Sequence, residues 1–281
     1  MLIVSIVFTG YYIYRYVSRQ KIPTQVQGKQ PIKNNNSTVV LLKTHVWTDD
    51  LEKFALKLKN ETIPYGIDFY ILMHNDDNQL PNKIKNRDLS KYVLTFSESE
   101  IRKVYSKGFF SMWLSNHWIL MWFYKQHQNK HYEYFWTIEY DVRISGDSSK
   151  LWKYTGTKDF LYPVGPFKDK NWTFKHHYVG GKLSDKDKYY GYLQLARYSN
   201  QFLKFLDSSY TAGENGQDEM ITFSLFKRGN FTGSDRLLRN LIKDSWSVDN
   251  TTVAKNKQLF DKSENDYRSD STHLRIFHPI K

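Results

Sequence analysis

Apolar residues follow two different periods along residues 38–281, and each period predicts a different element. Short, continuous apolar runs predict buried strands at 39–43, 67–73, 92–96, 134–139 and 160–164. Apolar residues at helical spacing, with start signals such as Asp49-Asp50 and the Ser97–Glu100 capping box, predict helices from Asp49, from Glu98, and over 111–126, 199–206 and 218–226. Strands that alternate with helices indicate an α/β fold with a mostly parallel central sheet and helices on both faces.

The first 37 residues have a different pattern. Residues 1–17 form an apolar and aromatic run that we interpret as an uncleaved membrane anchor. A signal peptide and a buried strand are the alternatives for this run. Residues 18–37 are polar and contain Pro23, Gly28, Pro31 and an Asn run, which is typical of a linker or stem. The folded domain is therefore expected over residues 38–281.

Two features of the sequence favour opposite sides of the membrane. Basic residues after the anchor favour a cytoplasmic domain under the positive-inside rule: Arg15, Arg19, Lys21, Lys29 and Lys33. Six Asn-x-Ser/Thr sites favour a lumenal domain: Asn35, Asn36, Asn60, Asn171, Asn230 and Asn250. We favour a single-pass membrane protein facing the lumen of the Golgi or endoplasmic reticulum, with a cytoplasm-facing, membrane-anchored protein as the alternative.

The formal net charge of +12, from 41 basic and 29 acidic residues, favours an anionic partner. The basic residues are spread along the chain, and neither a zinc-finger spacing nor the aromatic signature of an RNA-binding sheet occurs. We therefore expect no nucleic acid partner, which leaves an anionic membrane surface or a nucleotide diphosphate. The absence of cysteine excludes disulfides, thiolate catalysis and cysteine-ligated zinc.

The run Tyr134–Glu139 is followed closely by a second acid, Asp141. On a strand, side chains at i and i+2 face the same side, so both carboxylates are expected to point together. Ligands of open α/β sheets bind at the carboxyl ends of the strands. Two carboxylates at such an end form a site of hard oxygen ligands that suits a divalent cation bound to phosphates.

Three further elements fit the same site. The turn at His176–Gly181 contains Gly180 and Gly181, and glycines let the backbone approach a ligand closely, although an ordinary turn explains them equally well. Asp218 and Glu219 begin a predicted helix, where they either complement the helix dipole or act as a base toward an acceptor hydroxyl. In the tail, the His278 imidazole could complete the coordination shell of a metal and Lys281 could face a diphosphate, although this His-Pro pair is uninformative when taken alone.

The segment Trp136-Thr137-Ile138-Glu139-Tyr140-Asp141-Val142, followed by Gly146, resembles the acid-x-acid strand of GT-A-fold glycosyltransferases. It is most similar to a poorly characterised eukaryotic and viral group that carries Trp-x-x-Glu-Tyr-Asp-Val. Such enzymes share a glycine-containing loop, a later acidic element at a helix start and a carboxy-terminal metal-binding histidine. The matching positions occur here in the same order, at Gly180-Gly181, Asp218-Glu219 and His278.

The resemblance implies a catalytic domain over residues 38–281 that binds Mn²⁺ or Mg²⁺ through Asp141 and His278. Glu139 replaces the usual first Asp, so it is expected to contact either the metal, its water or the nucleotide ribose. The first strand, ending at Thr44, would run under the nucleotide base. Asp218 or Glu219 would act as the base or orient the acceptor, and neither inversion nor retention is favoured.

The sequence therefore predicts a metal-dependent glycosyltransferase, of hexosyl or pentosyl type, that uses a nucleotide-sugar donor. The acceptor would be a glycan, a glycoprotein or a glycolipid. Two alternatives stay open at this point. One is a catalytically inactive protein of the same fold that binds a nucleotide or sugar, and the other is a basic, membrane-associated interaction protein.

Overall fold

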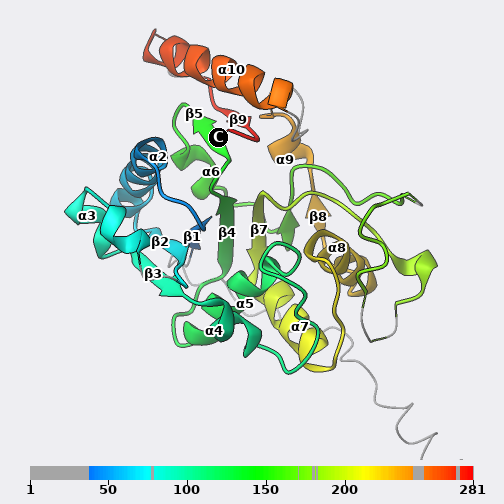
Figure 1. Cartoon of the computed structure of the whole chain (residues 1–281). Coiled ribbons are helices and arrows are strands. Elements are labelled where there is room, and N and C mark those ends of the chain that lie inside the picture. The colour runs from blue at the N-terminus through cyan, green and yellow to red at the C-terminus, as the bar shows by residue number, and fades with distance from the viewer. Residues whose placement is uncertain are drawn as a thin grey trace, which may run out of the picture. The chain divides into compact units, whose positions relative to one another are not determined.

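The computed structural model describes residues 38–76, 79–169, 171–178, 181, 183–242, 250–269 and 273–280. Seven strands of this part of the chain form the central sheet: β1 (Thr38–Thr44), β2 (Asp68–His74), β3 (Val93–Phe96), β4 (Tyr134–Glu139), β6 (Phe160–Leu161), β7 (Leu195–Ser199) and β8 (Gly233–Ser234). Their order in the sheet is β3-β2-β1-β4-β7-β6-β8 (Figure 1).

The sheet is mixed but mostly parallel. Strand β1 lies between β2 and β4 and is parallel to both, and β3 continues the parallel arrangement beside β2. Strand β7 is antiparallel to both of its neighbours, β4 and β6, whereas β8 is parallel to β6. The predicted α/β class with a mostly parallel sheet is therefore confirmed, with one antiparallel strand in its middle.

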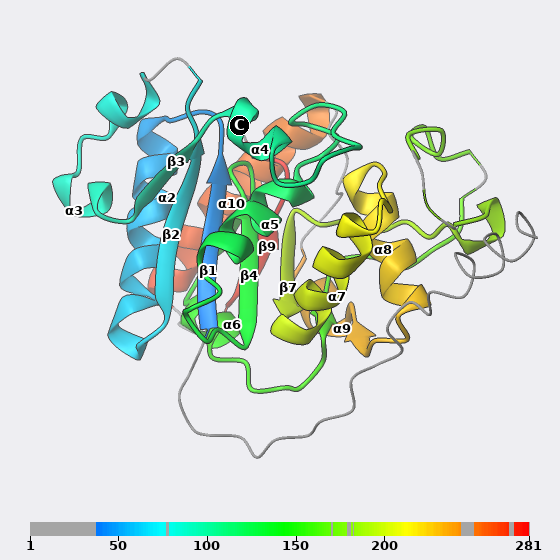
Figure 2. The ribbon, with the colours of Figure 1, turned by 90° about the horizontal axis from the view of Figure 1, so that it is seen from below.

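Helices cover both faces of the sheet (Figures 1 and 2). Figure 2 shows α5 (His117–Gln126) and α7 (Asn200–Thr211) in front of the strands, and α2 (Asp49–Asn60) and α10 (Asn250–Ser269) behind them. The remaining helices are α3 (Arg87–Ser90), α4 (Glu98–Arg102), α6 (Ser149–Trp152), α8 (Asp218–Arg228) and α9 (Arg236–Arg239), with three short 3-10 helices at Ile63–Tyr65, Leu80–Lys83 and Asp185–Asp187.

Strand β1 supplies side chains to the hydrophobic cores on both faces. Val39 and Leu41 pack with the aromatic core around Trp118, whereas Val40 and Leu42 pack with the core around Trp136. This division follows from the alternation of side chains along a strand. A strand that is buried on both faces needs apolar residues at successive positions, which explains its continuous apolar run.

Local start signals position the helices that follow β1 and β3. The Thr48 side chain accepts a hydrogen bond from the Leu51 amide and caps α2, a contact that stabilises a helix by about 1 kcal/mol. Ser97 and Glu100 form the predicted capping box of α4. Both helices begin where the sequence predicts.

The helix predicted over 111–126 begins only at His117. The preceding residues form turns, because the hydroxyls of Ser111 and Ser115 accept hydrogen bonds from the amides of Leu114 (3.2 Å) and Phe110 (3.0 Å). Serine side chains often stabilise such local turns in competition with a helix. This turn segment, 111–116, reaches the candidate site.

A second, two-stranded sheet joins the end of the acid motif to the carboxyl-terminal part of the chain. Strand β5 (Arg143–Ser145) pairs antiparallel with β9 (Arg275–Phe277), with Ile144 opposite Ile276. Helix α10 packs over this pair (Figure 1) through contacts such as Phe260 with Phe277, whose ring centroids are 5.7 Å apart. The apolar pattern of the sequence predicted neither β9 nor α10.

Residues 1–37, which hold the predicted anchor and linker, lie outside the described residues. Within the part that the structure describes, no helix combines the length and the apolar character needed to cross a bilayer. The domain boundaries proposed from the sequence thus stay predictions.

Candidate active site

A cavity of about 320 Å³ opens where β1 and β4 end. These two strands are parallel neighbours, with Lys43 of β1 directly opposite Glu139 of β4, so their carboxyl ends meet at one edge of the sheet. Ligands of α/β sheets bind at this edge. Charged, polar and aromatic side chains line the cavity, among them Lys43, Thr44, His45, His74, Trp113, Asn116, Glu139 and Asp141.

Glu139, Asp141 and His278 form one cluster beside this cavity. Each residue offers a ligand atom within 4.8 Å of the other two, and the Nε2 atom of His278 lies 3.5 Å from the Oδ1 atom of Asp141. Asp141 and His278 are buried, whereas Glu139 is half-buried. His278, far from the two acids in the sequence, thus lies beside them.

A turn, and not strand alternation, brings the two acids together. Strand β4 ends at Glu139, and the next residues form a turn closed by a hydrogen bond from the Val142 amide to the Glu139 carbonyl (3.1 Å). The buried Arg143 guanidinium donates to the carbonyls of Tyr140 and Val142 and pairs with Asp50 on α2 at 2.8 Å. This cation fixes the turn by several hydrogen bonds at once.

The pairing of β5 with β9 explains how His278 reaches the acids. Arg143 lies opposite Phe277, so the residues just before β5 face those just after β9. One more main-chain bond, from the Ile280 amide to the Asp141 carbonyl (2.7 Å), extends this contact past the strand ends. His278 is therefore held beside Asp141 by backbone pairing on both sides.

The donor set of the cluster fits a divalent cation. The buried Oδ1 atom of Asp141 receives no hydrogen bond from the residues that the structure describes, so this charged oxygen lacks the donors that burial normally requires. Two carboxylates and an imidazole combine hard oxygen ligands with one nitrogen ligand, a set that Mn²⁺ accepts. Glu139 differs, because its Oε1 already accepts from Asn116 Nδ2 (2.6 Å) and lies 3.5 Å from Lys43 Nζ. Asp141 therefore offers the more available oxygen ligand.

Asp218 and Glu219 begin helix α8 next to this cluster. The Oδ1 atom of Asp218 accepts from the Gln217 side chain (2.7 Å) and the Glu219 amide (2.8 Å). Glu219 accepts from the Gln194 side chain at 3.0 Å. Asp218 is buried, whereas Glu219 is half-buried and keeps access to solvent.

Two connections join the acid pair to the metal cluster. The side chain of Gln194 donates to Glu219, and its main-chain carbonyl accepts a hydrogen bond from the Glu139 amide (2.8 Å). On the other side, the Asp218 amide donates to the Leu114 carbonyl (2.9 Å), and Asn116 of the same turn segment binds Glu139. The two sets of acids thus share one polar network.

Burial and the nearby negative charge of Glu139 raise the pKa of Asp218 to about 7. Burial and Asp218 raise the pKa of Glu219 as well. The pair therefore holds a proton near neutral pH, because two neighbouring carboxylates that are partly shielded from water ionise together only at a high energetic cost. Carboxylates in this state can serve as general acids or bases at physiological pH.

Asp218 should lower the stability of the metal-free protein as the pH rises. Because the pKa of Asp218 in the folded protein lies above its ordinary value of 3.8, its contribution to the free energy of unfolding is fully present at low pH. That contribution is lost as the pH rises through about 7. Asp218→Asn should therefore raise Tm by several degrees at about pH 8 and by almost nothing at about pH 4, since 1 kcal/mol shifts Tm by roughly 2–4 °C in a domain of this size. Calorimetry of both proteins at both pH values measures this.

A matched control is Asp207→Asn, which removes a half-buried acid that has a cationic partner, Lys125, at 3.1 Å. This variant should be destabilised and not stabilised at about pH 8. Equal Tm changes for Asp218→Asn at the two pH values would contradict the raised pKa.

The structure places the other residues predicted for the site as follows. Thr44 lines the cavity, but its hydroxyl donates to the Val46 carbonyl and accepts from the Val46 amide, so it stabilises the end of β1. Gly181 has a φ of +97° and lies against Glu214, whose carboxylate occupies the space that a Cβ would need. Gly181 is absent from the residues that line the cavity. Gly180 and Lys281 lie outside the described residues, so their roles stay predictions.

Five residues of this region were missed from the sequence: Lys43, His45, His74, Asn116 and Gln194. Lys43, His45 and His74 could have been selected, because each lies at the carboxyl end of a predicted strand, where α/β ligands bind. Asn116 and Gln194 carry no such signal. Asn116 lies in a segment that the apolar pattern assigned to a helix, and Gln194 precedes the unpredicted strand β7.

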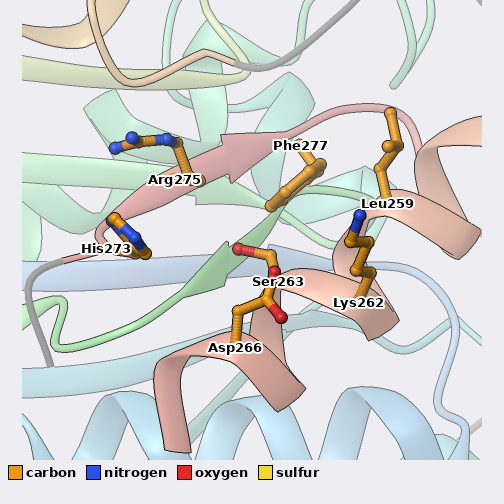
Figure 3. A pocket seen from close by; sticks show the side chains of 7 residues that line it. All are labelled: Leu259, Lys262, Ser263, Asp266, His273, Arg275 and Phe277. Carbon is orange, nitrogen blue, oxygen red and sulfur yellow. The ribbon is translucent and has the colours of Figure 1, made fainter. Parts of the chain in front are cut away.

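Helix α10 supports the histidine from behind. Its fully buried Asn256 donates to the carbonyl of His278 (2.7 Å) and to that of Pro279 (3.4 Å). A second cavity, of about 440 Å³, separates another part of α10 from β9 and is lined by Lys262, Ser263, Asp266, His273, Arg275, Phe277 and Leu259 (Figure 3). The two cavities share no lining residue.

Asn256→Ala should weaken metal binding without removing a metal ligand. The variant leaves buried carbonyls without their donor, which costs about 1–3 kcal/mol, and releases the segment that holds His278. We expect a loss of about 10-fold in Mn²⁺ affinity, as for other residues that orient metal ligands. Titration calorimetry with Mn²⁺ alone measures it, and Gln258→Ala, at an exposed position of the same helix, should leave the affinity unchanged. Unchanged affinity in Asn256→Ala would contradict this positioning role.

No protein-family model and no curated protein sequence matches the chain. Several solved structures are similar to parts of the chain, with TM-scores below 0.5. The galactosyltransferase LgtC in complex with donor and acceptor sugar analogs is 14% identical, with a TM-score of 0.36, over 67% of this chain and 70% of LgtC. A glycosyltransferase involved in glycosylation of the major capsid of PBCV-1 is 9% identical, with a TM-score of 0.30, over 62% and 65% of the two chains.

The inositol-1-phosphate CTP transferase from T. maritima is 9% identical, with a TM-score of 0.41, over 71% of this chain and 85% of that one. These structural neighbours are thus glycosyltransferases and a nucleotidyltransferase. At these identities and TM-scores the likeness carries no argument about function, which must come from the side chains of the site.

Proposed function

We propose that the chain is a metal-dependent glycosyltransferase that moves a sugar from a nucleotide-diphosphate donor to a carbohydrate-bearing acceptor. One observation carries the proposal. Glu139, Asp141 and His278 form a cation-sized cluster beside the cavity at the carboxyl ends of β1 and β4, and a second buried acid pair joins the same network. A site for phosphates and metal next to a separate acid or base suits metal-dependent transfer of a sugar to an acceptor hydroxyl.

Asp141 and His278 would hold the cation, with Glu139 as a third ligand or as a partner of a metal-bound water. A bound Mn²⁺ or Mg²⁺ supplies Lewis acidity toward the diphosphate leaving group, whose negative charge grows as the glycosidic bond breaks. Lys43 lies at the same edge and pairs with Glu139 at 3.5 Å. Its ammonium adds positive charge where phosphates would bind.

Asp218 and Glu219 would serve the acceptor. A carboxylate with a pKa near 7 is ionised in part at neutral pH and can take the proton of an acceptor hydroxyl. Gln217 and Gln194 donate hydrogen bonds to the pair and fix its orientation. The half-buried Glu219 is the more accessible of the two acids.

A panel of nucleotide sugars tests the proposal. The protein is incubated with UDP-, GDP- and ADP-sugars with Mn²⁺, with Mg²⁺ and with a chelator, and release of the nucleotide is measured. We expect cleavage of at least one donor that depends on the metal. Binding without cleavage would support an inactive nucleotide- or sugar-binding protein. The absence of both binding and cleavage would support a membrane-associated interaction protein, whose binding to vesicles falls as the salt concentration rises.

We also propose attachment to the membrane through residues 1–17 and a lumenal domain. Four of the six sequon asparagines belong to the described residues, and all four are exposed: Asn60, Asn171, Asn230 and Asn250. Each could carry a glycan on the folded surface. Treatment of protein from eukaryotic cells with a glycan-removing enzyme should lower its mass, and an unchanged mass would favour the cytoplasmic orientation.

A further inference from the structure

Trp113 is the most exposed large apolar side chain among the described residues, with 70% of its surface accessible. It lines the cavity of the candidate site. Most other tryptophans of this part of the chain are buried, such as Trp118, Trp136 and Trp152. An indole that lines this cavity and stays open to solvent loses the stability that burial would give, which suggests a ligand for its face.

The turn segment 111–116 holds this indole in a fixed position. Besides the two serine hydroxyls that bind backbone amides, the Ser115 amide donates to the Ser111 carbonyl at 2.8 Å, and Ser115 is fully buried. Phe174 packs against the indole in a T-shaped arrangement, with ring centroids 5.0 Å apart and ring planes at 82°. This contact limits the rotation of the indole, which keeps most of its surface accessible.

The same segment connects Trp113 to both parts of the site. The next residue, Leu114, accepts the Asp218 amide through its carbonyl (2.9 Å), and Asn116 donates to Glu139 (2.6 Å). Trp113 therefore projects from a short bridge between the proposed base and the proposed metal ligands. Its indole lines the same cavity as Glu139 and Asp141.

We infer that Trp113 is the stacking platform of the acceptor sugar, an inference that rests on the proposed function. The C–H groups on one face of a pyranose carry partial positive charge and suit the negative face of an indole. The acceptor recognised in this way is a carbohydrate with an apolar face, such as a β-galactoside or β-glucoside. Trp113 sets the preference for a sugar over a hydroxyl of a peptide side chain.

Fluorine NMR of fluorotryptophan-labelled full-length protein tests the platform without requiring turnover. Comparison with Trp113→Phe assigns the Trp113 signal, and the protein is then titrated with methyl β-galactoside, methyl β-glucoside and, as a control, glycerol. The Trp113 signal should shift and saturate with at least one glycoside but not with glycerol. Absence of a saturable shift with either glycoside would overturn the inference.

Variants provide the second measurement. Trp113→Ala should weaken glycoside binding about 10-fold, equal to about 1.4 kcal/mol, whereas Trp113→Phe, which keeps an aromatic face, should weaken it less. In transfer assays the loss should appear in the acceptor KM and much less in kcat. As a control, Tyr65→Ala removes another exposed aromatic ring, which contacts Lys153. It should change neither glycoside binding nor the acceptor KM.

The two hypotheses fail in different ways. Failure to cleave any nucleotide sugar would remove the proposed function and leave the Trp113 titration to decide whether a sugar platform exists. Donor cleavage with an unchanged acceptor KM in Trp113→Ala would remove the platform and leave the transferase intact.

Discussion

Asp141→Ala should reduce metal-stimulated cleavage of the donor by about 10³-fold or more. Stabilisation of the leaving group by a bound cation contributes several kcal/mol, and each 1.4 kcal/mol is a factor of about ten in rate. Asp141 should be the most sensitive ligand, because its buried Oδ1 accepts no hydrogen bond within the described residues, whereas Glu139 is already bound by Asn116. Nucleotide release with and without Mn²⁺ measures the loss.

Mn²⁺ binding gives this prediction a readout that does not depend on the donor. Titration with the metal alone should show no saturable binding to Asp141→Ala, while circular dichroism shows a folded protein. Asp147→Asn is the matched control, because Asp147 lies close in the sequence but binds the Ser149 amide (3.0 Å) and is not a member of the cation-sized cluster. Normal metal-stimulated cleavage by Asp141→Ala would refute the metal assignment.

The sequence predicts the half of the site that depends on local pattern. A continuous apolar run ending in Glu139 identifies β4, and its neighbour β1 follows from a second such run, so the edge of the sheet and its acids could be located. Helix α8 and its two acids follow from helical spacing and an acidic start. These signals lie within about ten residues of the positions they identify.

The other half depends on contacts between distant segments, which local patterns do not encode. His278 reaches Asp141 because β9 pairs with β5 and because Asn256 of α10 binds the tail, and neither element was predicted. Only the resemblance in motif order suggested this histidine. The open face of Trp113 was also hidden, since its position in an apolar stretch favoured a buried helix until the serines of the segment proved to form turns.

Glu219→Gln should lower the rate of sugar transfer by about 10²–10⁴-fold, the range that a general base contributes. Asp218→Asn should lower the same rate only about tenfold, because it changes the charge next to the base and leaves the base in place. The difference follows from access. Asp218 is buried and its Oδ1 binds Gln217 and the Glu219 amide. Glu219 is half-buried, and its oxygens accept from the side chains of Gln194 (3.0 Å) and Gln217 (3.4 Å).

Single-turnover transfer to a glycoside acceptor, followed over pH, measures both variants. The wild-type rate should rise with pH as the acid pair ionises, with a midpoint well above that of an ordinary carboxylate, because burial raises the pKa of both acids. Glu219→Gln should lose this rise. Asp218→Asn should keep the rise but with its midpoint at a lower pH, because one negatively charged neighbour of Glu219 is gone. Mn²⁺ affinity should stay within a few-fold of wild type in both, so a large loss of metal binding would mean that the pair supports the cluster and not the acceptor. Transfer rates equal to wild type in both variants would show that these acids have no catalytic role and only complement the dipole of α8 at its amino terminus.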